Sequence, residues 1–179
     1  MRVCLTLAFI LLLTSISFSW ANYTKAPPPV TYVNPKSFSG LWYEIARTYN
    51  SFEKNCVGAS VEYKLIDEFK YDVTNRCFEK TFEGKLISYN GTAEALYEQN
   101  MSQLEKTYFW IFSKDYRVIY LDDYKTAVMS DENMENLWIM NREPFLSKKK
   151  LDSILMFLDK YVDTSKLIFT PQNKDGKYK

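Results

Sequence analysis

Glu44 is the one acidic residue in the apolar stretch GLWYEIAR, residues 40–47. A carboxylate surrounded by apolar residues is stable only if it is neutralised, paired or hydrated. In a strand it would share a face with Trp42 and point inward, where an unpaired charge is costly. The carboxyl could pair with a Lys or Arg, stay protonated, or meet water held in a cavity. We expect a structural or water-mediated role rather than a catalytic one, because no second acid of matching alternation lies nearby.

The chain contains no histidine, which removes most of the usual catalytic and metal-binding arrangements. Histidine is the common general base, the partner of nucleophilic serines, and a frequent ligand of zinc and haem. Neither a glycine-rich phosphate loop nor a cysteine cluster is present. We therefore expect no catalytic residue, no metal site and no cofactor, although an enzyme built on carboxylate or tyrosine chemistry remains open.

Residues 1–21 have the pattern of a secretory signal peptide, with Arg2 near the start, an apolar run, and Ser19-x-Ala21 before a cleavage point. The run is short for a transmembrane span, and a retained membrane anchor is the alternative. Cys4 precedes the apolar run, so it cannot be the lipid-bearing cysteine of a bacterial lipoprotein. We expect an exported protein, periplasmic or secreted, that is soluble and not lipid-anchored.

Cys56 and Cys77 remain after residues 1–21 are removed, and in an oxidising compartment such a pair indicates a disulfide. The segments around them resemble two strands joined by a tight turn near Asp67-Glu68, which places both cysteines at the open end of a hairpin. Strict alternation puts the two on different faces, so we expect a bulge at Gly58 or a loop position for Cys56. Two free thiols are the alternative.

Charge argues against a nucleic-acid partner. Removing residues 1–21 takes away Arg2 and no acid, so 23 Lys and Arg become 22 against 22 Asp and Glu, a net charge of zero. Nucleic-acid binding needs clustered positive charge, and the run Lys148–Lys150 is better explained as a solvated helix start than as a lipid-headgroup site. The sequence leaves open the oligomeric state and the use of the glycosylation sequons at Asn22, Asn90 and Asn100.

Short alternating segments fill most of the chain and predict an all-β domain. We expect an extended proline-rich lead over 22–36, the folded domain over 37–171 and a flexible tail over 172–179. Eight strands in meander order fit an up-and-down barrel or a sandwich. Apolar residues at helical spacing then predict one helix capped by Ser147, whose single apolar stripe favours the barrel, because it needs a wall to cover. The expected strands are 40–47, 57–66, 69–78, 85–96, 106–113, 115–121, 126–130 and 136–142.

Three ordered blocks resemble those of the lipocalin family, and most closely its branch of bacterial lipocalins and apolipoprotein D. They are Gly40-x-Trp42, Asp122-Asp123-Tyr124, which departs from the common Thr-Asp-Tyr, and Asn141-Arg142-x-Pro144. The resemblance implies an eight-stranded antiparallel up-and-down β-barrel with one C-terminal α-helix packed outside.

At the closed end of such a barrel, Arg142 would lie over the ring of Trp42, and Gly40 would let the backbone pass close to it. An ordinary core Trp and a surface Arg are the alternative. The residues expected to build this scaffold are Gly40, Trp42, Asp123, Tyr124 and Arg142.

The barrel interior decides function, since an eight-stranded barrel can hold one small ligand and its inward residues alternate along every strand. Aromatic and Met walls favour a flat or flexible apolar ligand, and Tyr and Asn can bond a polar head. A cavity filled by these same side chains is the alternative. The expected ligand-binding set is Glu44, Ala46, Val61, Tyr63, Val73, Asn75, Tyr89, Ala93, Trp110, Phe112, Val118, Tyr120, Met129, Trp138 and Met140.

The resemblance also implies a ligand class. It points to non-catalytic binding and transport or storage of a fatty acid or lysophospholipid, in envelope or membrane maintenance, with membranes as a transient lipid source. A lipocalin-fold enzyme acting on a lipid or isoprenoid, and an interaction protein with a filled barrel, are the alternatives.

Overall fold

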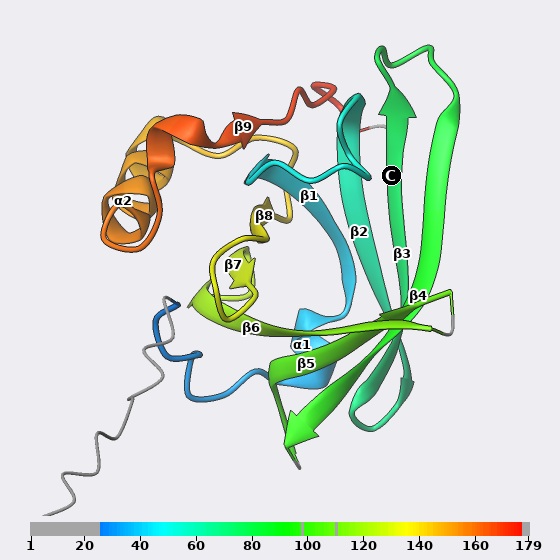
Figure 1. Ribbon diagram of the computed structural model, residues 1–179, viewed down its shortest axis with the longest axis vertical. Helices are drawn as coiled ribbons and strands as arrows, with labels where there is room; N and C mark the ends of the chain where they lie inside the picture. The colour runs from blue at the N-terminus through cyan, green and yellow to red at the C-terminus, as the bar shows by residue number, and fades with distance from the viewer. Residues whose placement is uncertain (1–25, 98, 110, 177–179) are drawn as a thin grey trace, which may run out of the picture.

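Eight antiparallel strands close into a barrel in the computed structural model, which describes residues 26–97, 99–109 and 111–176 (Figure 1). Each strand pairs with the next in sequence, and β1 pairs with both β2 and β8 to close the ring. This confirms the predicted all-β up-and-down barrel. The strands are β1 (Gly40–Arg47), β2 (Cys56–Asp67), β3 (Lys70–Glu79), β4 (Leu86–Tyr97), β5 (Asn100–Tyr108), β6 (Phe112–Asp122), β7 (Thr126–Ser130) and β8 (Leu137–Asn141).

The N-terminal lead closes one end of the barrel. Its last residues form a short helix, α1 (Pro35–Phe38), rather than the extended chain expected up to residue 36. Asn34 caps this helix by accepting a hydrogen bond from the backbone N–H of Ser37, and proline suits the first helical position. Val33 and Phe38 are fully buried beneath the strands, so this lead supplies the floor of the barrel.

Arg142 lies over the Trp42 ring at this closed end, as expected from the sequence, with its guanidinium carbon 3.8 Å from the ring centroid. The Trp42 indole N–H donates to the carbonyl of Phe38 at 2.9 Å. Gly40 has φ +95°, a backbone conformation that favours glycine, and a Cβ there would be in ordinary van der Waals contact with Arg142 Nη1 at 3.4 Å. The guanidinium ties the floor together by donating to the carbonyls of Ser37, Phe38, Ser39, Leu41 and Tyr124.

The turn between β6 and β7 holds the other two predicted scaffold residues. Asp123 and Tyr124 both have positive φ, and Asp123 is exposed beside Lys125. The Tyr124 hydroxyl accepts a hydrogen bond from the Asn34 backbone N–H at 2.9 Å, so this turn helps to hold the lead.

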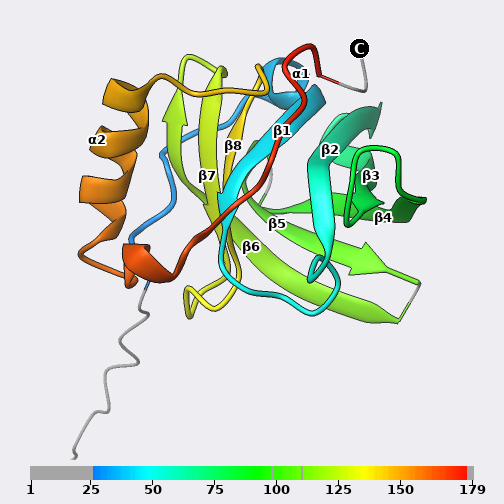
Figure 2. The ribbon, with the colours of Figure 1, turned by 90° about the horizontal axis from the view of Figure 1, so that it is seen from above.

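The C-terminal helix α2 (Lys148–Leu158) packs outside the barrel, beside β6, β7 and β8 (Figure 2). Ser147 caps it as predicted, accepting from the backbone N–H of Lys150. Ile154 and Leu158 are fully buried against the outer wall. Among the described residues, no helix is long and apolar enough to cross a membrane.

The chain after α2 returns to the barrel. A 3₁₀ turn, η1 (Thr164–Lys166), leads into β9 (Ile168–Phe169), which pairs with the last residues of β1. Gln172 donates to the carbonyls of Glu44 and Ala59, so the predicted flexible tail does not begin at residue 172.

A bulge in β2 brings the two cysteines together. The β2–β3 register shifts between Val57 and Ser60, and Gly58 takes φ +59°. Cys56 and Cys77 form a disulfide with their Cα atoms 5.4 Å apart, which confirms the predicted pair and the bulge that it required.

The fifth predicted strand is wrong in its position. Residues 106–113 were expected to run straight, but β5 ends at Tyr108 and β6 begins at Phe112. Phe109 has a positive φ in the hairpin turn between them. Apolar residues continue through this turn, and the sequence pattern therefore extended the strand across it.

Candidate ligand-binding site

The barrel encloses a cavity of about 550 Å³, a size typical of small-molecule sites. Its mouth lies opposite the floor, among the loops that join β1 to β2 and β5 to β6. The lining residues are Glu44, Asn50, Phe52, Glu53, Ser60, Val61, Tyr63, Asn75, Tyr89, Lys106, Tyr108, Phe109, Phe112, Ser113, Lys114, Tyr116, Met129, Asn136, Trp138 and Met140. The barrel is therefore not filled by its own side chains.

Most of the predicted inward set lies in this lining. These residues come from seven strands, and alternation along each strand placed them correctly in space. They are Glu44, Val61, Tyr63, Asn75, Tyr89, Phe112, Met129, Trp138 and Met140. Their contact with a ligand stays a prediction.

Three more predicted residues point inward without reaching the cavity. Val73, Ala93 and Val118 pack in the core cluster around Trp42 and Phe38, nearer the closed end. Trp110 lies outside the described residues.

Ala46 and Tyr120 are corrections, because both lie on the outer wall under α2. A register shift between Glu44 and Ala46 in β1, and another between Val118 and Tyr120 in β6, each place two consecutive residues on one face. When alternation is counted across such a bulge, every later side chain is assigned to the wrong face of the strand. The Tyr120 ring accordingly packs against Phe157 of α2, with centroids 6.2 Å apart.

Lys106 is the most informative residue that the sequence analysis missed. It lies on β5, is 7 % exposed, and its amine donates a hydrogen bond to the Tyr63 hydroxyl at 2.6 Å. Nζ stands 5.0 Å from the ring centroid of Tyr63, 5.3 Å from that of Tyr116 and 5.9 Å from that of Trp138. Lys106 and Tyr108 alternate with the same parity as Trp110 and Phe112 in the expected strand 106–113. The same counting would therefore have assigned Lys106 and Tyr108 to the cavity.

Burial controls the ionisation of this amine. Desolvation lowers the pKa of Lys106 to about 7, against the smaller opposing effect of the Glu53 carboxylate. The amine is thus a mixture of charged and neutral forms near neutral pH. Such a group can bind an anion as an ammonium and release a proton when the cavity is empty.

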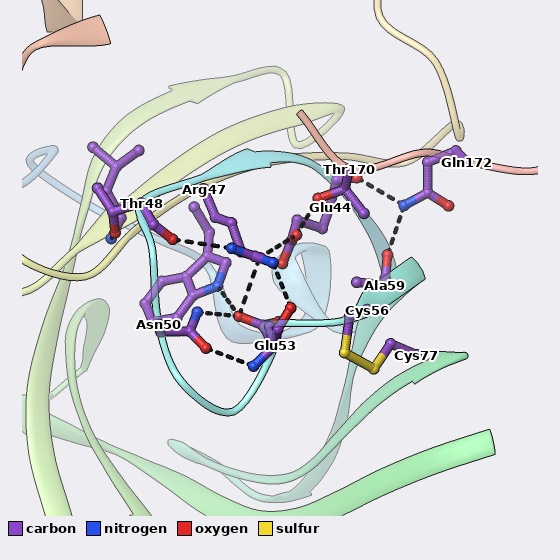
Figure 3. A network of polar contacts seen from close by, with 12 residues as sticks. Glu44, Arg47, Thr48, Asn50, Glu53, Cys56, Ala59, Cys77, Thr170 and Gln172 are labelled. Carbon is purple, nitrogen blue, oxygen red and sulfur yellow. Dashed lines mark hydrogen bonds and ion pairs between the residues drawn. A yellow bond between two sulfur atoms is a disulfide. The ribbon is translucent and has the colours of Figure 1, made fainter. Parts of the chain in front are cut away.

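Glu44 meets Arg47 and a second acid, Glu53, which enters from the loop after β1 (Figure 3). Arg47 Nε is 3.2 Å from Glu44 Oε1 and 3.7 Å from Glu53 Oε2, an electrostatic contact without an aligned hydrogen bond. Thr170 donates to Glu44, and the Trp138 indole N–H donates to Glu53 at 3.2 Å.

Burial, and then the neighbouring charge of Glu53, raise the pKa of Glu44 well above its usual value, while Thr170 and Arg47 act in the opposite direction. The sequence analysis found no second acid of matching alternation, and Glu53 escaped that criterion because it lies in a loop, where alternation has no meaning. Both carboxyls are held by protein groups, so the arrangement has the features of a structural network.

A sequence model for the lipocalin-like domain matches residues 33–172. The chain is 28 % identical over 173 residues to the outer membrane lipoprotein Blc of Vibrio cholerae, covering 92 % of this chain and 97 % of that one. It is 30 % identical over 151 residues to Blc of Escherichia coli K12, covering 82 % and 85 %, and 27 % identical over 157 residues to apolipoprotein D of Mus musculus, covering 82 % and 81 %.

Solved structures agree on the fold. Insecticyanin from the tobacco hornworm superposes with a TM-score of 0.68 at 20 % identity, covering 84 % of this chain and 88 % of that one. Lobster apocrustacyanin A1 gives 0.64 at 20 % identity, covering 81 % and 83 %. The family model spans residues 33–172, which include every strand of the barrel and its closed end, and the chain belongs to the lipocalin family.

Proposed function

We propose that this protein binds a single-tailed lipid, a fatty acid or a lysophospholipid, and carries or stores it for envelope or membrane maintenance. The lipocalin fold and the Blc and apolipoprotein D relatives support the broader function, which is binding of a small hydrophobic ligand. The single observation that carries the proposal is the open cavity of about 550 Å³ with aromatic and methionine walls.

The size of the hydrophobic effect makes such binding feasible. Burying a ten-carbon tail contributes on the order of 8 kcal/mol at ~0.8 kcal/mol per methylene, before the costs of association. Micromolar affinity is therefore within reach without any polar contact.

Non-catalytic binding fits the polar groups better than catalysis does. Glu44 and Glu53 are both engaged by Arg47, and further donors hold each of them, which leaves neither free to transfer a proton to a ligand. The alternative of a lipocalin-fold enzyme therefore receives no specific support from the site.

The rim of the cavity supports a membrane as the lipid source. Phe52, Phe109 and Phe112 line the mouth with large exposed fractions, and Ile111 is 75 % exposed in the same hairpin turn. Apolar side chains gathered at an opening suit contact with lipid. We propose an exported protein without a lipid anchor, whose leader of residues 1–21 lies outside the described residues.

Native mass spectrometry with a lipid panel tests this function. Delipidated protein should bind one fatty acid or lysophospholipid per chain. Asn75→Trp, which fills the cavity, should abolish uptake, whereas Thr74→Trp, on the other face of β3, should retain it. If no lipid and no apolar probe enters the wild-type protein, the proposal fails.

A further inference from the structure

We propose that Lys106 forms a carboxylate subsite at the inner end of the cavity, so that a fatty acid binds with its head toward the floor and its tail toward the mouth. The inference rests on the proposed lipid-binding function and adds to it an orientation and a preferred head group. It predicts that the acid, rather than the lysophospholipid, is the favoured ligand.

The position of Lys106 defines the inner end. Its amine contacts Tyr63, a fully buried residue of the floor cluster whose ring packs 5.3 Å from that of Phe38. Phe38 in turn packs on Trp42, with centroids 4.9 Å apart. A chain of rings thus connects the floor directly to the amine, and nothing polar besides Tyr63 is hydrogen-bonded to it among the described residues.

The other charged groups of the cavity are already paired. Arg47 is shared by Glu44 and Glu53, and Lys114 forms an ion pair with Asp131 at 2.6 Å. Within the part of the chain that the structure describes, no carboxylate oxygen lies within 4.0 Å of the Lys106 amine. A buried ammonium without a counter-ion is costly, and an entering carboxylate would relieve that cost.

Binding of an acid should therefore draw a proton onto the amine. The pKa of Lys106 is about 7 in the empty cavity, and a carboxylate in contact with it would raise that value. The surrounding phenols stay neutral, because burial raises the pKa values of Tyr63, Tyr108 and Tyr116, and burial also raises that of Glu44. The remaining charged groups near the cavity are Glu53, Arg47 and Lys114. The charge of Glu53 favours the ammonium form of Lys106, and Arg47 and Lys114 are already in ion pairs.

The mouth favours the tail over the head. Its rim carries Phe52, Phe109 and Phe112, and its lysine, Lys114, is occupied by Asp131. A ligand bound head-outward would have its carboxylate hydrated at the rim, near Asn50, Ser113 and Asn136, but would place methylenes against the Lys106 amine and leave that amine without a counter-ion. The reverse orientation pairs the buried amine with the carboxylate and places the tail beside the rings of the rim.

The test compares decanoic acid with 1-decanol on the full chain. Displacement of the uncharged probe N-phenyl-1-naphthylamine reports affinity for wild type and three variants at pH 6 and pH 8. Lys106→Met removes the charge, Lys106→Arg keeps it, and Lys64→Met removes an exposed lysine on the outside of β2 as a matched control. Calorimetry in two buffers of different ionisation heat measures proton uptake.

In wild type we expect decanoic acid to bind ~10- to 100-fold more tightly than 1-decanol at pH 6, the range of a hydrogen bond to a charged group. Lys106→Met should lose this preference, measured as the ratio of the two affinities within the variant, and Lys106→Arg and Lys64→Met should keep it. Proton uptake on binding the acid should approach about one per chain at pH 8, where the empty amine is mostly neutral, and be smaller at pH 6.

The outcomes separate the two proposals. Equal affinity for acid and alcohol in wild type, or an acid preference that survives in Lys106→Met, overturns the subsite and leaves lipid binding intact. Tighter binding of decyl phosphate than of decanoic acid overturns the choice of a carboxylate. Failure of both acid and alcohol to displace the probe contradicts lipid binding itself.

Discussion

Replacing Lys106 by methionine should stabilise the ligand-free protein, and the gain should shrink as pH rises. The folded-state pKa is about 7 against 10.5 for an ordinary lysine. Between these values the unfolded chain holds a proton that the folded chain lacks, so wild-type stability rises with pH through this window. Below pH 7 the amine is charged in both states, and burying it costs at most on the order of 5 kcal/mol, at 1.36 kcal/mol per pKa unit.

Urea denaturation of delipidated wild type and Lys106→Met at pH 6.5, 7.5 and 8.5 measures this effect. The difference between the two free energies of unfolding isolates Lys106, because all other titrating groups are shared. We expect Lys106→Met to be more stable by a few kcal/mol at pH 6.5, with a difference that falls by up to about 1.4 kcal/mol per pH unit above pH 7. A pH-independent difference would refute the depressed pKa. A Lys106→Met variant less stable than wild type at pH 6.5 would refute the cost of burial.

Three further changes test other parts of the structure. Arg142→Met should lower the free energy of unfolding by roughly 2–4 kcal/mol, because it removes the contact with the Trp42 ring and the donors to the floor carbonyls. In urea denaturation, Arg142→Lys should lie between wild type and Arg142→Met. An Arg142→Met variant as stable as wild type would contradict this role. Removing the disulfide by Cys56→Ala with Cys77→Ala should cost about 3 kcal/mol for a loop of this length, measured against wild type with and without reductant, and an unchanged reductant sensitivity in the variant would argue against it. Since the pKa of Glu44 is raised, the folded state keeps a proton that the unfolded state loses, and the contribution of this group to stability declines as pH rises from about 4.5 to its folded-state pKa. The difference in thermal stability between wild type and Glu44→Gln should therefore change with pH in this window, and a difference independent of pH would be inconsistent with the buried carboxyl.

The closed end of the barrel was predictable because its signals are local. Gly40, Trp42 and Arg142 lie in blocks that resemble those of the lipocalins, and the resemblance implied their arrangement at the floor, which the structure shows. Ser147 likewise marked the start of α2, because a capping side chain accepts a hydrogen bond from the backbone N–H three residues later, which is a local interaction. The disulfide followed from the hairpin and an expected bulge.

Two side chains were misplaced because bulges are decided by tertiary contacts. Ala46 and Tyr120 each follow a register shift, and both shifts lie under α2, where the outer wall must offer apolar side chains to the helix. Unlike Gly58 in β2, no glycine lies between Glu44 and Ala46 or between Val118 and Tyr120 to mark where the extra residue is inserted. Alternation is therefore reliable only up to the first bulge in a strand.

The sequence by itself determined an all-β chain with one late helix, the cysteine pair and nine of the residues that line the cavity, because alternation and spacing encode these features locally. Its resemblance to the lipocalin blocks implied the barrel and the Trp42–Arg142 floor. Only the tertiary structure decided the polar interior. Glu53 reaches Glu44 from a loop, and Lys106 meets Tyr63, 43 residues earlier in the chain. The ionisation of these groups depends on desolvation and on charges brought together by folding, which no local pattern contains.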